Sequence, residues 1–157
     1  MLDGRDKLEN YLRENAVSFE VQHHPRVVTA QEVAATEHIP GNMLAKTVMV
    51  LADGEMAMLV LPAPYEADLE KMGEVLEAKE VRLAEEEEFQ SAFPDCEVGA
   101  MPPFGNLYEL PVYVEVALAE DETIFFRAGT HTETMSLKYA DFEQLVQPTV
   151  AEFARRD

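Results

Sequence analysis

The sequence contains few basic side chains. It has 12 lysines and arginines against 31 aspartates and glutamates in 157 residues, a formal net charge of −19 at pH 7. Proteins that bind nucleic acids usually present a basic surface, so this balance argues, on average, against a phosphate-rich partner. A local basic patch is compatible with this net negative charge if the acids of residues 66–80 and 85–88 lie on faces remote from a site. Lys46, Arg127 and Lys138 are the candidates for such a patch.

Disulfides and membrane-spanning segments are also missing. Cys96 is the single cysteine and cannot form an internal disulfide, which agrees with a reducing compartment. No apolar run approaches the ~20 residues that span a bilayer, and the first residues lack the basic-then-apolar pattern of a signal peptide. We therefore expect a cytoplasmic protein with no membrane partner, folded as one domain over residues 1–157.

Several catalytic motifs are absent as well. The sequence has no Gly-x-Ser-x-Gly elbow, no Gly-x-Gly-x-x-Gly and no phosphate-binding P-loop, which disfavours covalent acyl transfer, dinucleotide binding and NTP hydrolysis. No two of its four histidines have zinc-motif spacing with a carboxylate or thiolate partner. We predict no metal and no cofactor, and we interpret Cys96 as a buried small hydrophobe rather than a nucleophile.

The pattern of apolar residues predicts an α+β fold, with a mixed, mostly antiparallel sheet and helices around it. Helices are expected over residues 5–15, 33–35, 68–76, 84–93 and 139–146. Single strands are expected over residues 18–22, 81–83 and 134–138. Two hairpins are expected, one joining residues 45–51 to 55–61 through Ala52-Asp53-Gly54 and one joining residues 111–118 to 122–127.

Three separated segments place possible functional groups beside backbone shaped by glycine or proline, namely residues 45–48, 99–105 and 128–133. In the first, Lys46 begins a strand whose two faces are both mostly apolar, so we expect that strand to be covered on both sides. Partial burial would lower the pKa of Lys46, because burial disfavours the charged form. Spacing alone favours the alternative, a lysine that only extends its ammonium group to water.

The second and third segments offer hydrogen-bond donors. Two prolines framed by Gly99 and Gly105 predict a rigid loop, in which the amides of Gly99, Ala100 and Met101 could bind a developing oxyanion. An ordinary tight connection is the alternative. His131 follows Gly129 and Thr130 directly after a strand, where it is either a ligand-binding group or a histidine bonded within its own turn.

In this order and spacing, the segments resemble the YbaK/ProX family of aminoacyl-tRNA deacylases, which is related to the editing insertion of bacterial prolyl-tRNA synthetases. The resemblance covers about residues 23–148. It includes the Thr29-Ala30-Gln31-Glu32-Val33-Ala34 helix, Lys46-Thr47, the Gly99-x-x-x-Pro103 loop, the Gly129-Thr130-His131 turn and Asp141-Phe142. It implies a YbaK-like fold.

The resemblance also implies an activity, trans-editing hydrolysis of the ester on a mischarged tRNA that carries a small amino acid. Lys46 matches the residue tied to catalysis in the family. The residues expected to bind the 3′ aminoacyl-adenosine end are Thr47, Gly99, Ala100, Met101, Pro103, Phe104, Gly129, Thr130 and His131. Further partners would be a synthetase or an elongation factor that delivers the tRNA.

The chain departs from the family in two respects, one of which bears on amino-acid specificity and the other on tRNA binding. Pro102 stands where cysteine-clearing relatives carry a serine, so the amino acid is left open. The acidity predicts weak affinity for tRNA. The alternative to an enzyme is therefore a non-catalytic module that binds an amino acid or an aminoacyl nucleotide with the same fold.

Overall fold

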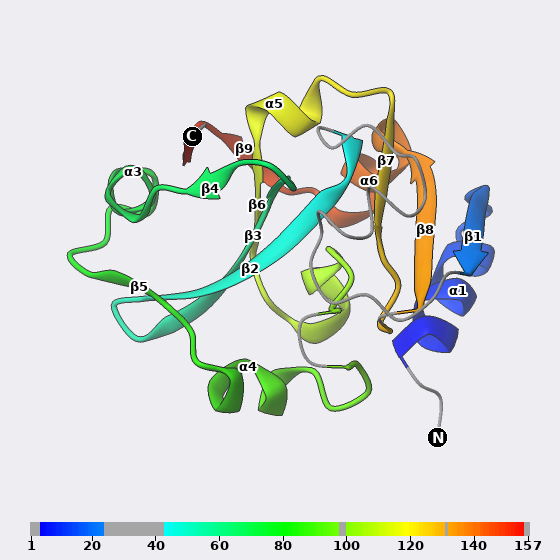
Figure 1. Ribbon diagram of the computed structural model, residues 1–157, viewed down its shortest axis with the longest axis horizontal. Coiled ribbons are helices and arrows are strands. Elements are labelled where there is room, and N and C mark those ends of the chain that lie inside the picture. The colour runs from blue at the N-terminus through cyan, green and yellow to red at the C-terminus, as the bar shows by residue number, and fades with distance from the viewer. Residues whose placement is uncertain (1–3, 24–42, 98–99, 131, 156–157) are drawn as a thin grey trace.

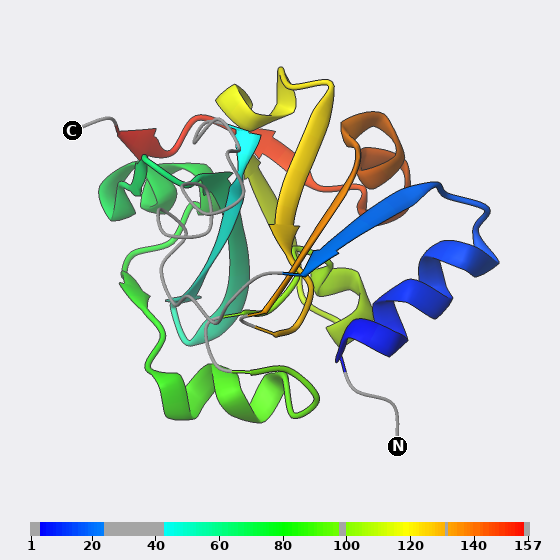
Figure 2. The ribbon, with the colours of Figure 1, turned by 45° about the vertical axis from the view of Figure 1, so that its right-hand side comes forward.

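The computed structural model describes residues 4–23, 43–97, 100–130 and 132–155. The first helix, α1 (Gly4–Glu14), buries Leu8 and Leu12 and partly buries Tyr11, as their helical spacing predicts. It is followed by β1 (Phe19–His23). Figure 2 shows α1 folding back beside β1. The expected helix at residues 33–35 lies outside the described residues.

The predicted hairpin of β2 (Ala45–Ala52) and β3 (Glu55–Pro62) is confirmed and forms the centre of the molecule (Figure 1). Asp53 and Gly54 both have positive φ, 48° and 87°, the backbone that a two-residue turn between twisted strands requires. Glycine suits the second position because it adopts this φ without a steric cost.

The hairpin belongs to a five-stranded sheet of order β5-β2-β3-β6-β9. The strand β5 (Val81–Leu83), which was expected, pairs with β2, while β6 (Val112–Glu115) and β9 (Thr149–Ala151) continue the sheet beyond β3 in parallel pairings. A second sheet joins β1, β8 (Glu133–Lys138) and β7 (Thr123–Arg127), all antiparallel. A third consists of β4 (Glu66–Ala67) and β10 (Ala154–Arg155). The mixed, mostly antiparallel character is as expected, although the strands are divided among separate sheets.

The expected hairpin between residues 111–118 and 122–127 is wrong. The strand β6 ends at Glu115, and the short helix α5 (Val116–Ala119) follows at once. The Glu115 carboxylate accepts a hydrogen bond from the Ala117 amide at 2.8 Å and so caps this helix. The turn of helix redirects the chain, and β7 then pairs with β8 in the other sheet.

The remaining helices cover the sheets. Asp68 caps α3 (Leu69–Leu76), as predicted, and accepts hydrogen bonds from the amides of Glu70 and Lys71. The acidic helix is α4 (Glu86–Ala92), and α6 (Tyr139–Val146) buries Phe142. The 3-10 helix η2 (Gly105–Tyr108) was not expected.

Apolar side chains pack on both faces of the five-stranded sheet, as the two apolar faces of β2 predict. One cluster contains Ala45 and Met49 together with α1, α6 and the β7–β8 pair. The other contains Val50, Leu59, Leu61, Met72 and Phe153. Among the described residues, no helix is long and apolar enough to cross a membrane.

Candidate functional site

The cavity that contains Lys46 is the candidate functional site. It is open, has a volume of about 690 Å³ and lies between β2 and the segment formed by β4, the start of α3 and β10. We call it the Lys46 cavity. Its lining residues are Lys46, Val48, Glu66, Ala67, Asp68, Leu69, Glu70, Leu83 and Arg155.

Lys46 is the second residue of β2 and pairs with Leu61 of β3. Because side chains alternate along a strand, Lys46 shares a face with Val48 and Val50, which is the face of the Leu61 and Phe153 cluster. The side chain is half-buried, and this burial lowers the pKa of Lys46 from its ordinary value of 10.5. The Glu66 carboxylate acts in the opposite direction and favours the ammonium form. The expected direction of the pKa shift is confirmed.

An ion pair forms another part of the cavity. Glu66 and Arg155 face each other across the β4–β10 pairing, with Arg155 Nη2 3.0 Å from Glu66 Oε2. Asp68, which follows β4, is engaged at the N-terminus of α3. Glu66, Asp68 and Glu70 line the Lys46 cavity, so these three acids do not lie on a face remote from the candidate site. The β2–β3 register explains this, because it places Ala45 opposite Pro62, so that the chain after Pro62 emerges beside Lys46.

The C-terminal segment that carries Arg155 is fixed by buried contacts. Glu115 is only 3% exposed, and its Oε1 accepts hydrogen bonds from the amides of Phe153 and Ala154, both at 3.0 Å. The Phe153 side chain is fully buried, and its carbonyl accepts a hydrogen bond from the Asp68 amide at 2.7 Å. We call this arrangement the Glu115 clamp. It joins β6, α5 and β10 and sets the position of Arg155.

The predicted loop residues that the structure describes lie on the other side of the sheet. Met101 and Phe104 belong to the cluster that contains Ala45 and Met49, and the Phe104 ring contacts the rings of Tyr11, Phe126 and Phe142. Ala100 and Pro103 are buried too. Thr47 pairs with Val60, a residue of the same cluster. None of these described residues lines the Lys46 cavity.

Two of the three predicted segments do meet. The Gly129 amide donates to the Ala100 carbonyl at 2.9 Å, and the Gly129 carbonyl accepts from the Glu97 amide at 2.9 Å. The Ala100 amide donates to the Glu97 carbonyl at 3.0 Å. Since the loop itself uses this donor, the oxyanion hypothesis depends on the amides of Gly99 and Met101. Gly99 and His131 lie outside the described residues.

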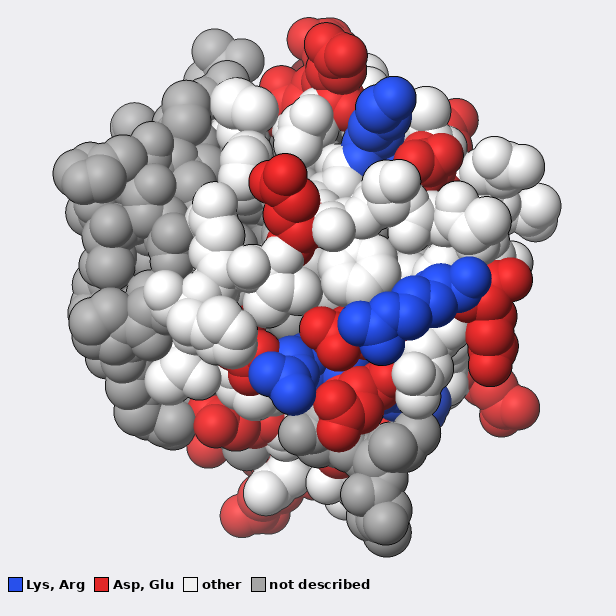
Figure 3. All heavy atoms as spheres, turned by 90° about the vertical axis from the view of Figure 1, so that its right-hand side faces the viewer, with Lys and Arg blue, Asp and Glu red and all other residues white. Residues whose placement is uncertain are grey.

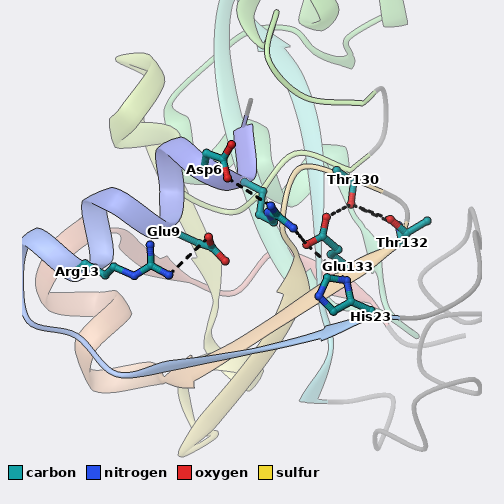
Figure 4. Close-up of polar contacts among 8 residues, drawn as sticks. Asp6, Glu9, Arg13, His23, Thr130, Thr132 and Glu133 are labelled. Atoms are coloured by element: carbon teal, nitrogen blue, oxygen red, sulfur yellow. Dashed lines mark hydrogen bonds and ion pairs between the residues drawn. The ribbon is translucent and has the colours of Figure 1, made fainter. Parts of the chain in front are cut away.

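The turn at Gly129 and Thr130 packs against the first turn of α1. Gly129 has a φ of 95°, and a Cβ there would lie 3.1 Å from the Arg5 nitrogen, so both conformation and space require glycine. Beside it, the buried Glu133 carboxylate accepts hydrogen bonds from Arg5 at 2.5 Å and from the Thr130 hydroxyl at 3.3 Å. Figure 4 shows Thr130 and His23 on either side of Glu133. These contacts hold the turn in which Thr130 lies.

Cys96 is partly buried rather than fully buried as expected, and its environment agrees with the expectation that it is not a nucleophile. Burial, first of all, raises the pKa of its thiol to about 11, and the nearby Asp95 carboxylate acts in the same direction. The Tyr108 hydroxyl lies 3.3 Å from the Cys96 sulfur and donates to Asp95 Oδ1 at 2.9 Å. A thiol in this environment is a poor nucleophile, because the thiolate is the reactive form.

The three residues considered for a basic patch do not form one. Arg127 is buried, Lys46 is half-buried in its cavity, and Lys138 is exposed at the end of β8. On the face drawn in Figure 3, basic side chains lie beside acidic ones. Lys7 pairs with Asp95 and Arg13 with Glu9, and such pairs leave little net positive potential.

Glu66 and Arg155 are the cavity residues that the sequence reasoning missed. The hairpin register could have located Glu66, which follows the end of β3 by four residues. Arg155 gives no such signal, because its position comes from the pairing of two-residue strands that are far apart in the sequence. The described lining contains no serine, threonine, cysteine or histidine. Its chemistry is therefore that of charges which position a ligand and stabilise developing charge.

Comparison with known proteins gives a family and a fold. The family described as "Aminoacyl-tRNA editing domain" matches residues 24–145. The proline–tRNA ligase of Acidithiobacillus ferrooxidans (strain ATCC 53993 / BNL-5-31) is 35% identical over 91 residues, which are 58% of this chain but only 16% of the ligase. The Ser/Thr-tRNA deacylase ProXp-y of Escherichia coli (strain K12) is 29% identical over 141 residues, 83% of this chain and 84% of that protein.

The solved structures support the fold. A crystal structure described as a candidate trans-editing enzyme for prolyl tRNA synthetase superimposes with a TM-score of 0.85 at 18% identity, and 99% of each chain is covered. The crystal structure of hypothetical protein APE2540 gives a TM-score of 0.86 at 19% identity. At these identities the likeness establishes a shared architecture.

Proposed function

Because the chain belongs to the aminoacyl-tRNA editing domain family, we propose that it hydrolyses, in trans, the ester between a wrongly attached small amino acid and the 3′ ribose of a tRNA. The observation that carries the proposal is the half-buried Lys46 in an open cavity at the start of β2. The match to ProXp-y supports action in trans, since it covers 83% of this chain and 84% of that protein.

The proposed mechanism needs no protein nucleophile. An aminoacyl ester is already activated, so positioning and electrostatic stabilisation suffice to accelerate attack by water. Lys46 anchors the ribose or phosphate end of the substrate, and the ribose hydroxyl next to the ester assists the attacking water. The oxyanion role expected of the amides of Gly99, Ala100 and Met101 is not part of this mechanism, because the Ala100 amide donates within its loop and Met101 packs on the other face of the sheet.

The other predicted binding residues that the structure describes lie outside the Lys46 cavity, and in this proposal they support it. Phe104 packs in the cluster on the other face of the sheet, and Thr47 supports β2 from that face. The turn of Gly129, Thr130 and His131 positions the terminal adenosine or the amino acid. The contacts of Glu133 with Arg5 and Thr130 support this, because they fix the turn.

A panel of mischarged tRNAs tests the activity. Alanyl-, cysteinyl-, seryl- and threonyl-tRNA would be incubated with the protein, and the rate of deacylation would be compared with the rate in buffer. We expect one small amino acid to be released well above the buffer rate. A pocket that excludes larger side chains would give this selectivity, whereas favourable contacts with one methylene contribute only ~1–3 kcal/mol. Buffer rates on all four would refute the proposal.

The acidity of the chain favours a second candidate, a non-catalytic module that binds an amino acid or an aminoacyl nucleotide. Thermal unfolding with free amino acids and with non-hydrolysable aminoacyl-adenosine analogues separates the two. A ligand at one hundred times its Kd stabilises the folded state by ~2.7 kcal/mol. Stabilisation by the free amino acid alone, without deacylation, would favour the module.

Three further expectations accompany the enzyme. It works in the cytoplasm, where tRNAs are charged, it folds as one domain over residues 1–157, and a synthetase or an elongation factor delivers the tRNA. The proline–tRNA ligases among its relatives support a synthetase as the partner. The chain corresponds to 16% to 23% of those ligases, so their other activities are not transferred to it.

A further inference from the structure

The Lys46 cavity contains charges of both signs, and the mechanism proposed above uses only the positive one. Lys46 and Arg155 are basic, whereas Glu66, Asp68 and Glu70 are acidic. An aminoacyl-tRNA also carries both signs near its ester, namely the α-ammonium group of the amino acid and the phosphodiester of the terminal nucleotide. The acidic part of the cavity therefore matches a group that every aminoacyl ester presents.

Glu66 is the carboxylate best placed to meet this group. It lies close enough to Lys46 to favour the ammonium form of that side chain, and just over half of its own side chain is exposed. Asp68, by contrast, is engaged with the amides of Glu70 and Lys71. A carboxylate can accept about four hydrogen bonds, so a ligand ammonium group can share Glu66 with Arg155.

Arg155 holds the Glu66 carboxylate, and the Glu115 clamp holds the strand of Arg155. Arg155 Nη2 lies 3.0 Å from Glu66 Oε2, and the two residues are directly opposite each other in the β4–β10 pairing. The clamp adds two hydrogen bonds to a carboxylate that is 3% exposed. Arg155 also lies outside residues 24–145, the part matched by the family. The family match therefore covers Glu66 and Glu115 but not Arg155.

We propose that Glu66 binds the α-ammonium group of the aminoacyl ester in the Lys46 cavity, and that Arg155 is the positioning residue that orients the Glu66 carboxylate. This inference rests on the proposed function. With the ammonium group on Glu66 and the ribose or phosphate end on Lys46, the ester lies between the two. A substrate that lacks the ammonium group loses one of these two points of attachment.

The consequence is discrimination between aminoacyl esters and their hydroxy-acid counterparts. A site that binds a charged donor rejects an analogue without it, because the acceptor then loses its partner. A charged hydrogen bond of this kind gives about a tenfold preference at a partly exposed site. For alanine, the counterpart is lactyl-tRNA, in which a hydroxyl replaces the ammonium group with little change in size.

The experiment uses whichever amino acid is released in the panel and measures kcat/KM for its aminoacyl ester and for the matching hydroxy-acid ester. Each value is divided by the rate constant of the same ester in buffer, so that the intrinsic reactivities of the two esters cancel. The wild-type protein should prefer the aminoacyl ester about tenfold, and Glu66→Gln should reduce this ratio towards one. Glu66→Asp should keep part of it. The ratio is measured within each variant, so a loss of folded protein affects both esters equally and cancels.

Arg155 is tested by the same ratio. Arg155→Gln should lower the preference, whereas Arg155→Lys, which keeps a cation near Glu66, should restore much of it. Glu74→Gln, on α3 but outside the cavity lining, is the matched control and should keep the wild-type ratio. A merely structural role of Arg155 would change the two rates together and leave the ratio unchanged.

The outcomes separate this inference from the proposed function. If the wild-type protein hydrolyses both esters equally, or if Glu66→Gln keeps the wild-type ratio, the protein is a deacylase and the inference about Glu66 is refuted. An unchanged ratio in Arg155→Gln refutes the positioning role. If no ester in the panel is hydrolysed above the buffer rate, the proposed function fails and the inference fails with it.

Discussion

Lys46 experiences two opposing influences, and their balance sets the form in which it works. Burial lowers its pKa below 10.5, while Glu66 favours the cation. The cation is the form that binds a ribose hydroxyl or a phosphate by charge-assisted hydrogen bonds. Activity should therefore be complete below the lowered pKa of Lys46 and should be lost as the pH rises through it.

A pH profile of kcat/KM, corrected for spontaneous ester hydrolysis, checks this prediction. The wild-type protein should lose activity at an alkaline pH below 10.5. Lys46→Arg, whose guanidinium stays protonated, should lack this loss and show only the decrease, common to both proteins, that follows deprotonation of the substrate's own amino group. An identical alkaline loss in both proteins would show that another group, such as the amino group of the substrate, causes it.

The Cys96 thiol should react slowly with alkylating reagents in the folded protein. With a pKa of about 11, its thiol is only roughly 0.1% thiolate near pH 8, against a large fraction for an unperturbed thiol. Iodoacetamide should therefore modify the folded protein far more slowly than the protein unfolded in urea. Mass spectrometry over time measures both rates. Equal rates would show that the thiol is exposed and not the buried group described here.

The candidate residues differ in how far the sequence could locate them. Lys46 could be predicted, because a lone lysine at the start of a doubly apolar strand is a local signal. Arg155 could not, because its place depends on the Glu115 clamp, which joins residues 38 and 39 positions apart. The sequence pattern also could not show that Met101 and Phe104 pack on the face opposite Lys46, since loops carry no alternation.

At the scale of elements, the Glu115 clamp explains both the error in the predicted hairpin and the shape of the cavity. One buried carboxylate caps α5 and holds the amides that lead into β10. Local signals predicted the β2–β3 hairpin and the cap of α3, because Asp53-Gly54 and Asp68 act on adjacent residues. A glutamate at the end of a strand gives no comparable signal.

Replacement of Glu115 tests the clamp. Glu115→Ala leaves three amide groups without their acceptor and should lower the free energy of unfolding by about 3 kcal/mol. Glu115→Gln keeps one acceptor oxygen and should lower the free energy of unfolding by less. Urea unfolding at neutral pH measures both values. If the two variants lose the same small amount, water replaces the carboxylate and the clamp contributes little.

At the scale of the whole molecule, the charge limits how tRNA can bind. The net charge of −19 repels a phosphate backbone at long range, and Lys7, Arg13 and Arg155 on the described surface are paired with acids. Attraction then comes from the few cations in the site. This favours recognition of the 3′ end alone over contact along the tRNA.

The salt dependence of binding checks this prediction. The logarithm of the association constant falls with the logarithm of salt by about 0.7 for each phosphate neutralised on a single strand. One or two contacts therefore give a slope of roughly −1. Fluorescence anisotropy with labelled tRNA over a range of salt measures it. A much steeper slope would reveal an extended basic surface.

The role of Lys46 is tested by the deacylation rate of the mischarged tRNA that turns over best, measured with wild-type protein, with Lys46→Ala and with the matched control Lys71→Ala. Lys71 lies on α3 outside the cavity lining and pairs only loosely with Glu152, at 3.9 Å. If the Lys46 cavity is the active site, Lys46→Ala falls to the buffer rate while it stays folded, and Lys71→Ala keeps the wild-type rate. Wild-type deacylation by Lys46→Ala would contradict the account.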